Sequence, residues 1–126
     1  MNKKSKGLLS IAGALLMSAL LPASAVLAAE TGSNLNSNLA EGKKLAFSRP
    51  KGNCLACHMI KGGESPGNIA PPLIVMKARF PDKQVLKEQI WDASKRNPDT
   101  SMPLFGRHEI LTAAELDKVV DYIHSL

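Results

Sequence analysis

The chain of 126 residues carries 16 lysine and arginine residues against 11 acidic ones, a formal charge of +5. Three of the basic residues, Lys3, Lys4 and Lys6, lie at the extreme N-terminus, so the rest of the chain has 13 basic and 11 acidic residues, a balance of +2. No basic run is mixed with aromatic residues, and this composition argues against nucleic acid as a partner. The length suits one domain with a modest core.

The first 28 residues have the pattern of a secretory signal peptide. Three lysines precede an apolar run over 8–21, and the segment Pro22-Ala-Ser-Ala-Val-Leu-Ala-Ala29 follows. A positive start, a short apolar stretch and an A-x-A-like site are typical of export signals. We predict cleavage after Ala28 and a periplasmic mature protein without a membrane span. An uncleaved membrane anchor is the alternative, but the run is shorter than the ~20 residues that a span needs.

Residues 29–38 are polar and lack periodic apolar positions, so we expect a flexible N-terminus there, followed by a domain over 39–126. A first helix is predicted from Leu39 to Phe47. Pro50 is expected to stop it.

The pentapeptide Cys54-Leu-Ala-Cys-His58 is the most informative part of the chain. C-x-x-C-H is the attachment signal for a c-type haem, because two thiols can form thioethers with its vinyl groups while the imidazole binds iron as the proximal ligand. The sequence therefore predicts one covalent haem c, bound through Cys54 and Cys57, with His58 as an axial ligand of the iron.

Two other uses of the cysteines compete with this interpretation. A thioredoxin-like redox pair requires a βαβ context, which the sequence lacks. A zinc site that combined Cys54 and Cys57 with His108 and His124 fits no usual ligand spacing. Haem attachment is favoured over both.

Glycine and proline dominate residues 61–72, which are predicted to form a loop. Such a loop can place a backbone carbonyl against the second ring nitrogen of His58, and Pro71 is the candidate acceptor. Several basic residues near the motif either steer a partner toward the haem edge or form an ordinary solvated face. They are Lys43, Lys44, Arg49, Lys51 and Lys61.

Two later helices are predicted. The middle helix runs from Pro81 to Ser94 and ends before Asn97-Pro98. The last helix begins with the capping box Thr112-Ala-Ala-Glu115 and carries an apolar stripe that is expected to face the core. The stripe consists of Leu116, Val119, Val120 and Ile123.

The candidates for the second axial ligand are Met59, Met76, Met102, His108 and His124. Met59 adjoins the proximal histidine and cannot easily cross the ring. Met76 lies in an apolar run, where methionine usually fills the core. Met102 lies between Ser101 and Pro103 in an irregular segment between two helices, and it is the favoured candidate. His/Met ligation raises the reduction potential and suits electron transfer.

Four segments of the chain carry a family resemblance. They are Gly52-Asn-Cys-Leu-Ala-Cys-His58, Asn68-Ile-Ala-Pro-Pro-Leu73, Trp91-Asp-Ala-Ser-Lys-Arg-Asn-Pro-Asp-Thr-Ser-Met-Pro103 and Ile110-Leu-Thr-Ala-Ala-Glu-Leu-Asp-Lys-Val-Val-Asp-Tyr-Ile123. In these segments the chain resembles SoxX, the family of small monohaem c-type cytochromes of the bacterial sulfur-oxidising (Sox) system. The third segment is the most specific. Ala70 stands where relatives commonly have glycine.

The resemblance implies an all-α class I cytochrome c fold, with short helices around a covalent haem and with His58 and Met102 as axial ligands. It also implies a heterodimer or heterotrimer with a SoxA-like cytochrome. In that family the complex acts as an L-cysteine S-thiosulfotransferase, which joins thiosulfate oxidatively to a cysteine of the SoxYZ carrier. Catalysis is expected on the partner, so this chain has no predicted catalytic residue and would pass electrons to a soluble cytochrome c.

Two alternatives to this function stay open. The chain could be a freestanding class I cytochrome c that serves a terminal oxidase or reductase. It could also bind small ligands at an exchangeable sixth position on the iron.

Overall fold

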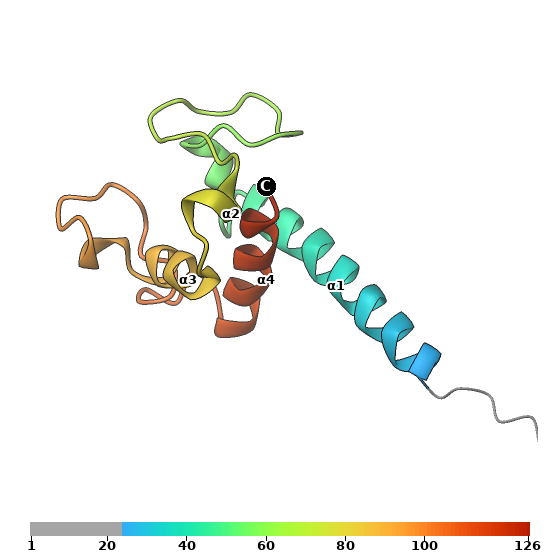
Figure 1. Ribbon diagram of the computed structural model, residues 1–126. Coiled ribbons are helices and arrows are strands. Elements are labelled where there is room, and N and C mark those ends of the chain that lie inside the picture. Colours follow the sequence, from blue (N-terminus) through green and yellow to red (C-terminus); the bar gives the residue numbers. More distant parts are fainter. Residues whose placement is uncertain (1–23) are drawn as a thin grey trace, which may run out of the picture.

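The structure is a computed structural model that describes residues 24–126, and within this range it contains helices and turns but no strand. The predicted all-α fold is confirmed. A long first helix projects from a compact group of shorter elements, and the C-terminus lies within that group (Figure 1). In chain order the elements are α1 (Ser24–Phe47), η1 (Cys54–Ala56), α2 (Met76–Arg79), α3 (Lys83–Trp91), η2 (Ala93–Lys95) and α4 (Ala113–His124).

Helix α1 is longer than the sequence predicted. It ends at Phe47 as expected but begins at Ser24, so that residues 29–38, which the sequence led us to expect as a flexible segment, lie within the helix. A helix already nucleated by packing gains one backbone hydrogen bond for each residue added, and a polar sequence does not prevent that growth. The N-terminal part of α1 extends away from the other helices (Figure 1), and Leu35 is 53% exposed.

The predicted signal peptide lies largely outside the described residues, which start at Ser24. The predicted cleavage point after Ala28 falls within α1. Among the helices described between residues 24 and 126, none combines the length and the apolar character that a membrane crossing requires.

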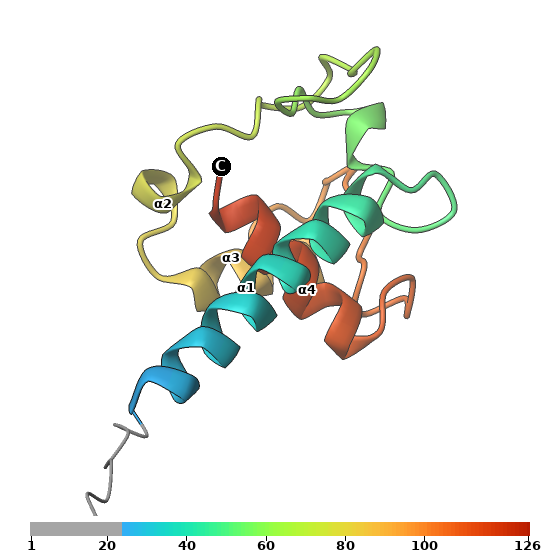
Figure 2. The same cartoon turned by 90° about the vertical axis from the view of Figure 1, so that its right-hand side faces the viewer.

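The crossing of α1 and α4 forms the centre of the core (Figure 2). Gly42 lies at this crossing, where a Cβ would overlap the backbone carbonyl of Lys118, so only glycine allows the two backbones to approach this closely. The Lys118 ammonium also pairs with the Glu41 carboxylate beside the crossing. The apolar stripe predicted on the last helix is buried here, with each side chain at most 2% exposed: Leu116, Val119, Val120 and Ile123.

Helix α4 starts at the predicted capping box. The Thr112 side-chain oxygen accepts a hydrogen bond from the backbone N–H of Glu115 at 3.2 Å, and the Glu115 carboxylate accepts one from the N–H of Thr112 at 2.9 Å. Each bond satisfies a backbone donor that has no partner within the helix. The start of α4 is therefore fixed by local sequence.

Helix α3 is shorter than the predicted range of Pro81 to Ser94. Asp82 caps its start, because its side chain accepts a hydrogen bond from the Gln84 N–H at 2.8 Å. Asp92 leaves the helical conformation (φ −150°, ψ 87°) and instead caps η2 by accepting from the Ser94 N–H at 3.1 Å. Asp82 thus sets the start of α3, and Asp92 separates α3 from η2.

The short helix α2 was not predicted. It follows Val75, which adopts a left-handed conformation (φ 51°), and it places the side chain of Met76 in the core with 1% of its surface exposed. The expectation that Met76 fills the core is therefore confirmed. α2 and the C-terminal end of α4 lie close together, and the Met76 N–H donates to the Leu126 carbonyl at 3.4 Å.

Candidate haem site

The Cys-x-x-Cys-His motif forms a single tight turn directly after α1. Asn53 starts the turn in the left-handed region (φ 46°), which asparagine tolerates better than most residues. The carbonyl of Cys54 then accepts hydrogen bonds from the backbone N–H groups of Cys57 and His58, at 3.3 and 2.9 Å. This turn brings both thiols and the imidazole together within five residues.

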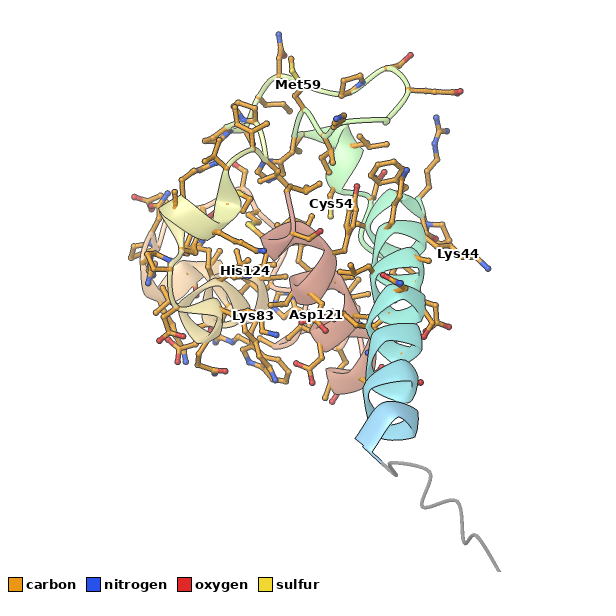
Figure 3. All side chains as sticks on the ribbon, turned by 45° about the vertical axis from the view of Figure 1, so that its right-hand side comes forward. Lys44, Cys54, Met59, Lys83, Asp121 and His124 are labelled. Atoms are coloured by element: carbon orange, nitrogen blue, oxygen red, sulfur yellow. The ribbon has the colours of Figure 1, made fainter. Side chains whose placement is uncertain are left out.

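Both cysteines are free thiols and half-buried. Cys54 packs against the core cluster, near the upper end of α4 in Figure 3, and burial raises the pKa of its thiol to about 11. A redox-active Cys-x-x-Cys pair instead has a thiol whose pKa is lowered, because the thiolate is the nucleophile. The environment of Cys54 therefore speaks against the thioredoxin-like alternative.

The zinc alternative also finds no support. Over the residues that the structure describes, no group of three or more histidine, cysteine or acidic side chains is arranged to hold a metal ion. His108 is exposed in the segment before α4. His124, in α4, has its Nε2 atom 3.0 Å from the Phe80 carbonyl oxygen. Neither histidine joins the two cysteines.

The glycine- and proline-rich loop over 61–72 folds back onto the motif. Three alternate carbonyls of the motif segment each accept one backbone hydrogen bond from the loop or the residue after it. The pairs are Gly67 N–H to Leu55 at 2.7 Å, Ala70 N–H to Cys57 at 3.1 Å and Leu73 N–H to Met59 at 2.9 Å. The loop is thus attached to the motif along its length and not only at its ends.

Gly67 allows this close approach. A Cβ on Gly67 would overlap the backbone carbonyl of Ala56, so the position requires glycine for space and not for a left-handed backbone. Ala70, where relatives commonly have glycine, does not adopt a positive φ, and its N–H makes a regular hydrogen bond. The alanine is therefore compatible with the loop.

The hydrogen bond expected between His58 and Pro71 is present, with 2.7 Å between Nδ1 and the carbonyl oxygen. A carbonyl can only accept, so Nδ1 carries the proton and Nε2 keeps its lone pair. That tautomer is the one that binds a metal through Nε2, and the hydrogen bond to Pro71 fixes the orientation of the ring. Two free thiols and a histidine in this state fit a covalently attached haem. When bound, the haem supplies a one-electron couple at its iron.

The candidates for the sixth ligand lie in contrasting places. Met59 is 54% exposed at the outer edge of the motif segment, far from Cys54 in Figure 3, whereas Met76 is fully buried in the core. Met102 is half-buried, packs against the core cluster and lies in the irregular segment between η2 and α4. Of the three methionines, only Met102 combines contact with the core and a position outside any helix.

Short-range hydrogen bonds shape the segment that carries Met102. The Asn97 N–H donates to the Ala93 carbonyl and the Thr100 N–H to the Asn97 carbonyl, both at 3.1 Å. The side-chain oxygen of Thr100 accepts from the Met102 N–H at 3.1 Å. These residues lie in the segment 91–103; from the sequence, Asn97 was expected only to end the middle helix, and Thr100 had no expected role.

Part of the basic group near the motif is engaged within the protein. Lys51 pairs with Glu115 at 2.9 Å, and the ammonium of Lys43 lies 5.5 Å from the centre of the Phe47 ring. Lys44 projects outward from α1 in Figure 3, and Arg49 and Lys61 are exposed. The group is thus not a uniform free patch.

Comparison with known proteins gives a family. The family model described as cytochrome c matches residues 39–126. An uncharacterised lipoprotein of Aquifex aeolicus (strain VF5) is 35% identical over 78 residues, which cover 59% of this chain and 36% of that protein. This chain thus spans about a third of the length of that relative. The chain belongs to the cytochrome c family, as an electron-transfer protein with a class I fold and covalently attached haem c.

Proposed function

We propose that Cys54 and Cys57 attach the haem and that His58 and Met102 bind its iron from opposite faces. The hydrogen bond from His58 to the Pro71 carbonyl carries the proximal part of this proposal, because it leaves Nε2 free for iron. The proposal for Met102 is supported by its half-buried position in an irregular segment that packs on the core.

Replacement of methionine by leucine tests the distal ligand. Met102→Leu in the holo-protein should abolish the far-red sulfur-to-iron band of the oxidised form while the haem stays attached. The reduction potential should fall by on the order of 100 mV, because the axial ligand is a main determinant of potential.

Met59→Leu is the matched control, since Met59 is exposed and lies next to the proximal histidine. It should leave both the band and the potential unchanged. An unchanged band in Met102→Leu would exclude Met102 as the ligand. Absence of the band from the parent protein would favour an exchangeable sixth position instead.

At the level of biological role, we propose that the chain is the SoxX-like electron-transfer subunit of a SoxAX-type complex. The support is the resemblance over 91–103, together with a structure in which most of that string shapes one loop. In this role a SoxA-like subunit joins thiosulfate to the SoxYZ carrier, and this chain accepts the electrons and passes them to a soluble cytochrome c. The chain by itself performs electron transfer only.

Purification of the tagged mature protein from thiosulfate-grown cells tests this role. We expect a stable complex in which mass spectrometry identifies a second c-type cytochrome and haem staining finds more than one haem chain. A lone monohaem monomer would contradict the SoxAX role and support a freestanding carrier for a terminal oxidase or reductase.

We also propose export to the periplasm, with removal of residues 1–28. The lysine-rich start, the apolar run and the small-residue segment support it, and covalent haem attachment is consistent with it. N-terminal sequencing of the periplasmic fraction should find a protein that starts at Ala29. An intact N-terminus in the membrane fraction would contradict cleavage.

A further inference from the structure

The segment that carries Met102 is closed at its base by backbone hydrogen bonds and by one buried carboxylate, Asp92. We propose that Asp92 and Arg107 are positioning residues for Met102, because their ion pair joins the two ends of segment 92–107 and resists withdrawal of the methionine from the iron. This inference rests on the proposed ligation by Met102.

Asp92 contacts both ends of the segment. One oxygen, Oδ1, accepts from the backbone N–H and the hydroxyl of Ser94, which hold the start of the segment in η2. The other oxygen, Oδ2, lies 3.4 Å from Nη1 of Arg107 at the far end. The Asp92 side chain is only 8% exposed, whereas that of Arg107 is 60% exposed. The buried carboxylate of Asp92 is thus paired with a guanidinium, that of Arg107, which faces solvent.

The backbone at the base supports the same closure. The Trp91 carbonyl accepts from the N–H groups of Gly106 and Arg107, at 3.1 and 3.3 Å. Gly106 lies against the face of the Trp91 indole, so that a Cβ there would overlap the ring. The two ends of the segment are therefore in direct contact through their backbones, and the Asp92–Arg107 pair adds a side-chain link between them.

Closure of the base is transmitted to Met102 along the segment. The hydrogen bonds from Ala93 through Asn97 and Thr100 to Met102 link η2 to the methionine. Within the segment, between Asn97 and Met102, these bonds are all local and make no link to α1 or α4. If the base opens, the ends are no longer held together, and the free segment gains conformational entropy. The position of Met102 then depends on the closed base as well as on its own packing against the core.

A positioning role predicts an effect on ligand exchange that a purely structural ion pair does not have. An external ligand can bind the iron only after Met102 has moved away, so its apparent affinity includes the cost of opening the segment. Weakening the Asp92–Arg107 pair lowers this cost. Ferric holo-protein should then bind imidazole more tightly, although no imidazole contact has been added.

The test is a titration of the oxidised holo-protein with imidazole. The loss of the far-red band measures binding. Arg107→Gln should lower the dissociation constant by about two- to fivefold, the range expected from loss of one ion pair with an exposed partner. Arg107→Lys should recover most of the parent value, because the contact involves a single nitrogen. Asp92→Asn should resemble Arg107→Gln, provided that its circular dichroism spectrum matches the parent.

Lys83→Gln is the matched control. It removes an ion pair with Asp121, at 2.6 Å, that joins α3 to α4 outside the segment (Figure 3). The control should change unfolding stability by a similar amount and leave imidazole affinity as it was.

Two results would overturn the inference in distinguishable ways. If Arg107→Gln and Lys83→Gln shift the imidazole affinity equally while the parent shows the far-red band, the ion pair has no positioning role and the proposed ligation stands. If the parent shows no such band, the ligation by Met102 and the positioning role both fail.

Discussion

The two segments that carry the proposed iron ligands are held in different ways. The proximal segment, 54–73, has backbone hydrogen bonds from its loop to three alternate carbonyls of the motif, and the His58 ring adds a fourth bond to Pro71. The distal segment, 92–107, is closed at its base and packs on the core through Phe105 and Met102, while the hydrogen bonds that reach Met102 are all local.

This difference indicates how each ligand responds to perturbation. His58, the proposed proximal ligand, lies in the same turn as Cys54 and Cys57, so its departure from the iron would require that turn to distort. Met102, the proposed distal ligand, would need only one loop to open. We therefore expect substitutions in the proximal segment to affect haem attachment and global stability, and those in the distal segment to affect ligand exchange first.

The largest effect is expected when both cysteines of the proximal segment are replaced. With Cys54→Ser and Cys57→Ser together, no thioether can form, and covalent haem should be lost completely. Haem staining of the denatured protein and intact mass measure this. The fold should also lose stability, because the haem is a large apolar group. Retention of covalent haem would place the attachment elsewhere.

An intermediate effect is expected from Gly67→Ala, which forces a Cβ against the Ala56 carbonyl. Overpacking of this kind costs about 1–3 kcal/mol, and for a domain of this size each kcal/mol lowers the melting temperature by about 4–8 °C. Thermal unfolding of the holo-protein measures the loss.

Gly62→Ala is the control for this change in the same loop. A Cβ there would make only an ordinary contact with the Lys43 ammonium, at 3.6 Å, so the cost comes from the positive φ of 78°. It should cost about 1 kcal/mol. Equal losses in the two variants would show that the contact between loop and motif is loose.

The smallest expected effect concerns acid stability. Hydrogen bonds from Thr112 and Lys51 lower the pKa of the Glu115 carboxyl. Because the pKa is lower in the folded state, Glu115 stabilises the protein above the pKa of the unfolded state, about 4.3, and this contribution is lost as pH falls through the lower folded value. Lys51 lies just before the haem motif, so acid should weaken the attachment of α4 to the proximal segment.

Glu115→Gln should flatten this pH dependence. The melting temperature of the parent should fall more steeply below about pH 4.5 than that of the variant, and the two curves should approach each other in acid. Parallel curves from pH 7 to pH 3 would contradict a stabilising role for the carboxylate.

Local sequence was sufficient to predict several elements. The capping box at Thr112 and Glu115 defined the start of α4 because both bonds lie within four residues. The C-x-x-C-H spacing predicted covalent haem because the chemistry lies within one turn. The predicted bounds of the middle helix were wrong, because the side chains of Asp82 and Asp92 cap the backbone at its two ends. These caps shorten α3 relative to the predicted range.

The remaining features depend on residues far apart in the chain. Gly42 is required because α4 crosses α1 at that point, and nothing near Gly42 in sequence indicates it. The pairing of Asp92 with Arg107 depends on closure of a loop of which only one end, Asp92, lies in the segment 91–103. The sequence by itself determined the cofactor and its family, because those reside in contiguous motifs. Only the tertiary structure decided how firmly each ligand segment is held, because that depends on which distant backbone groups meet.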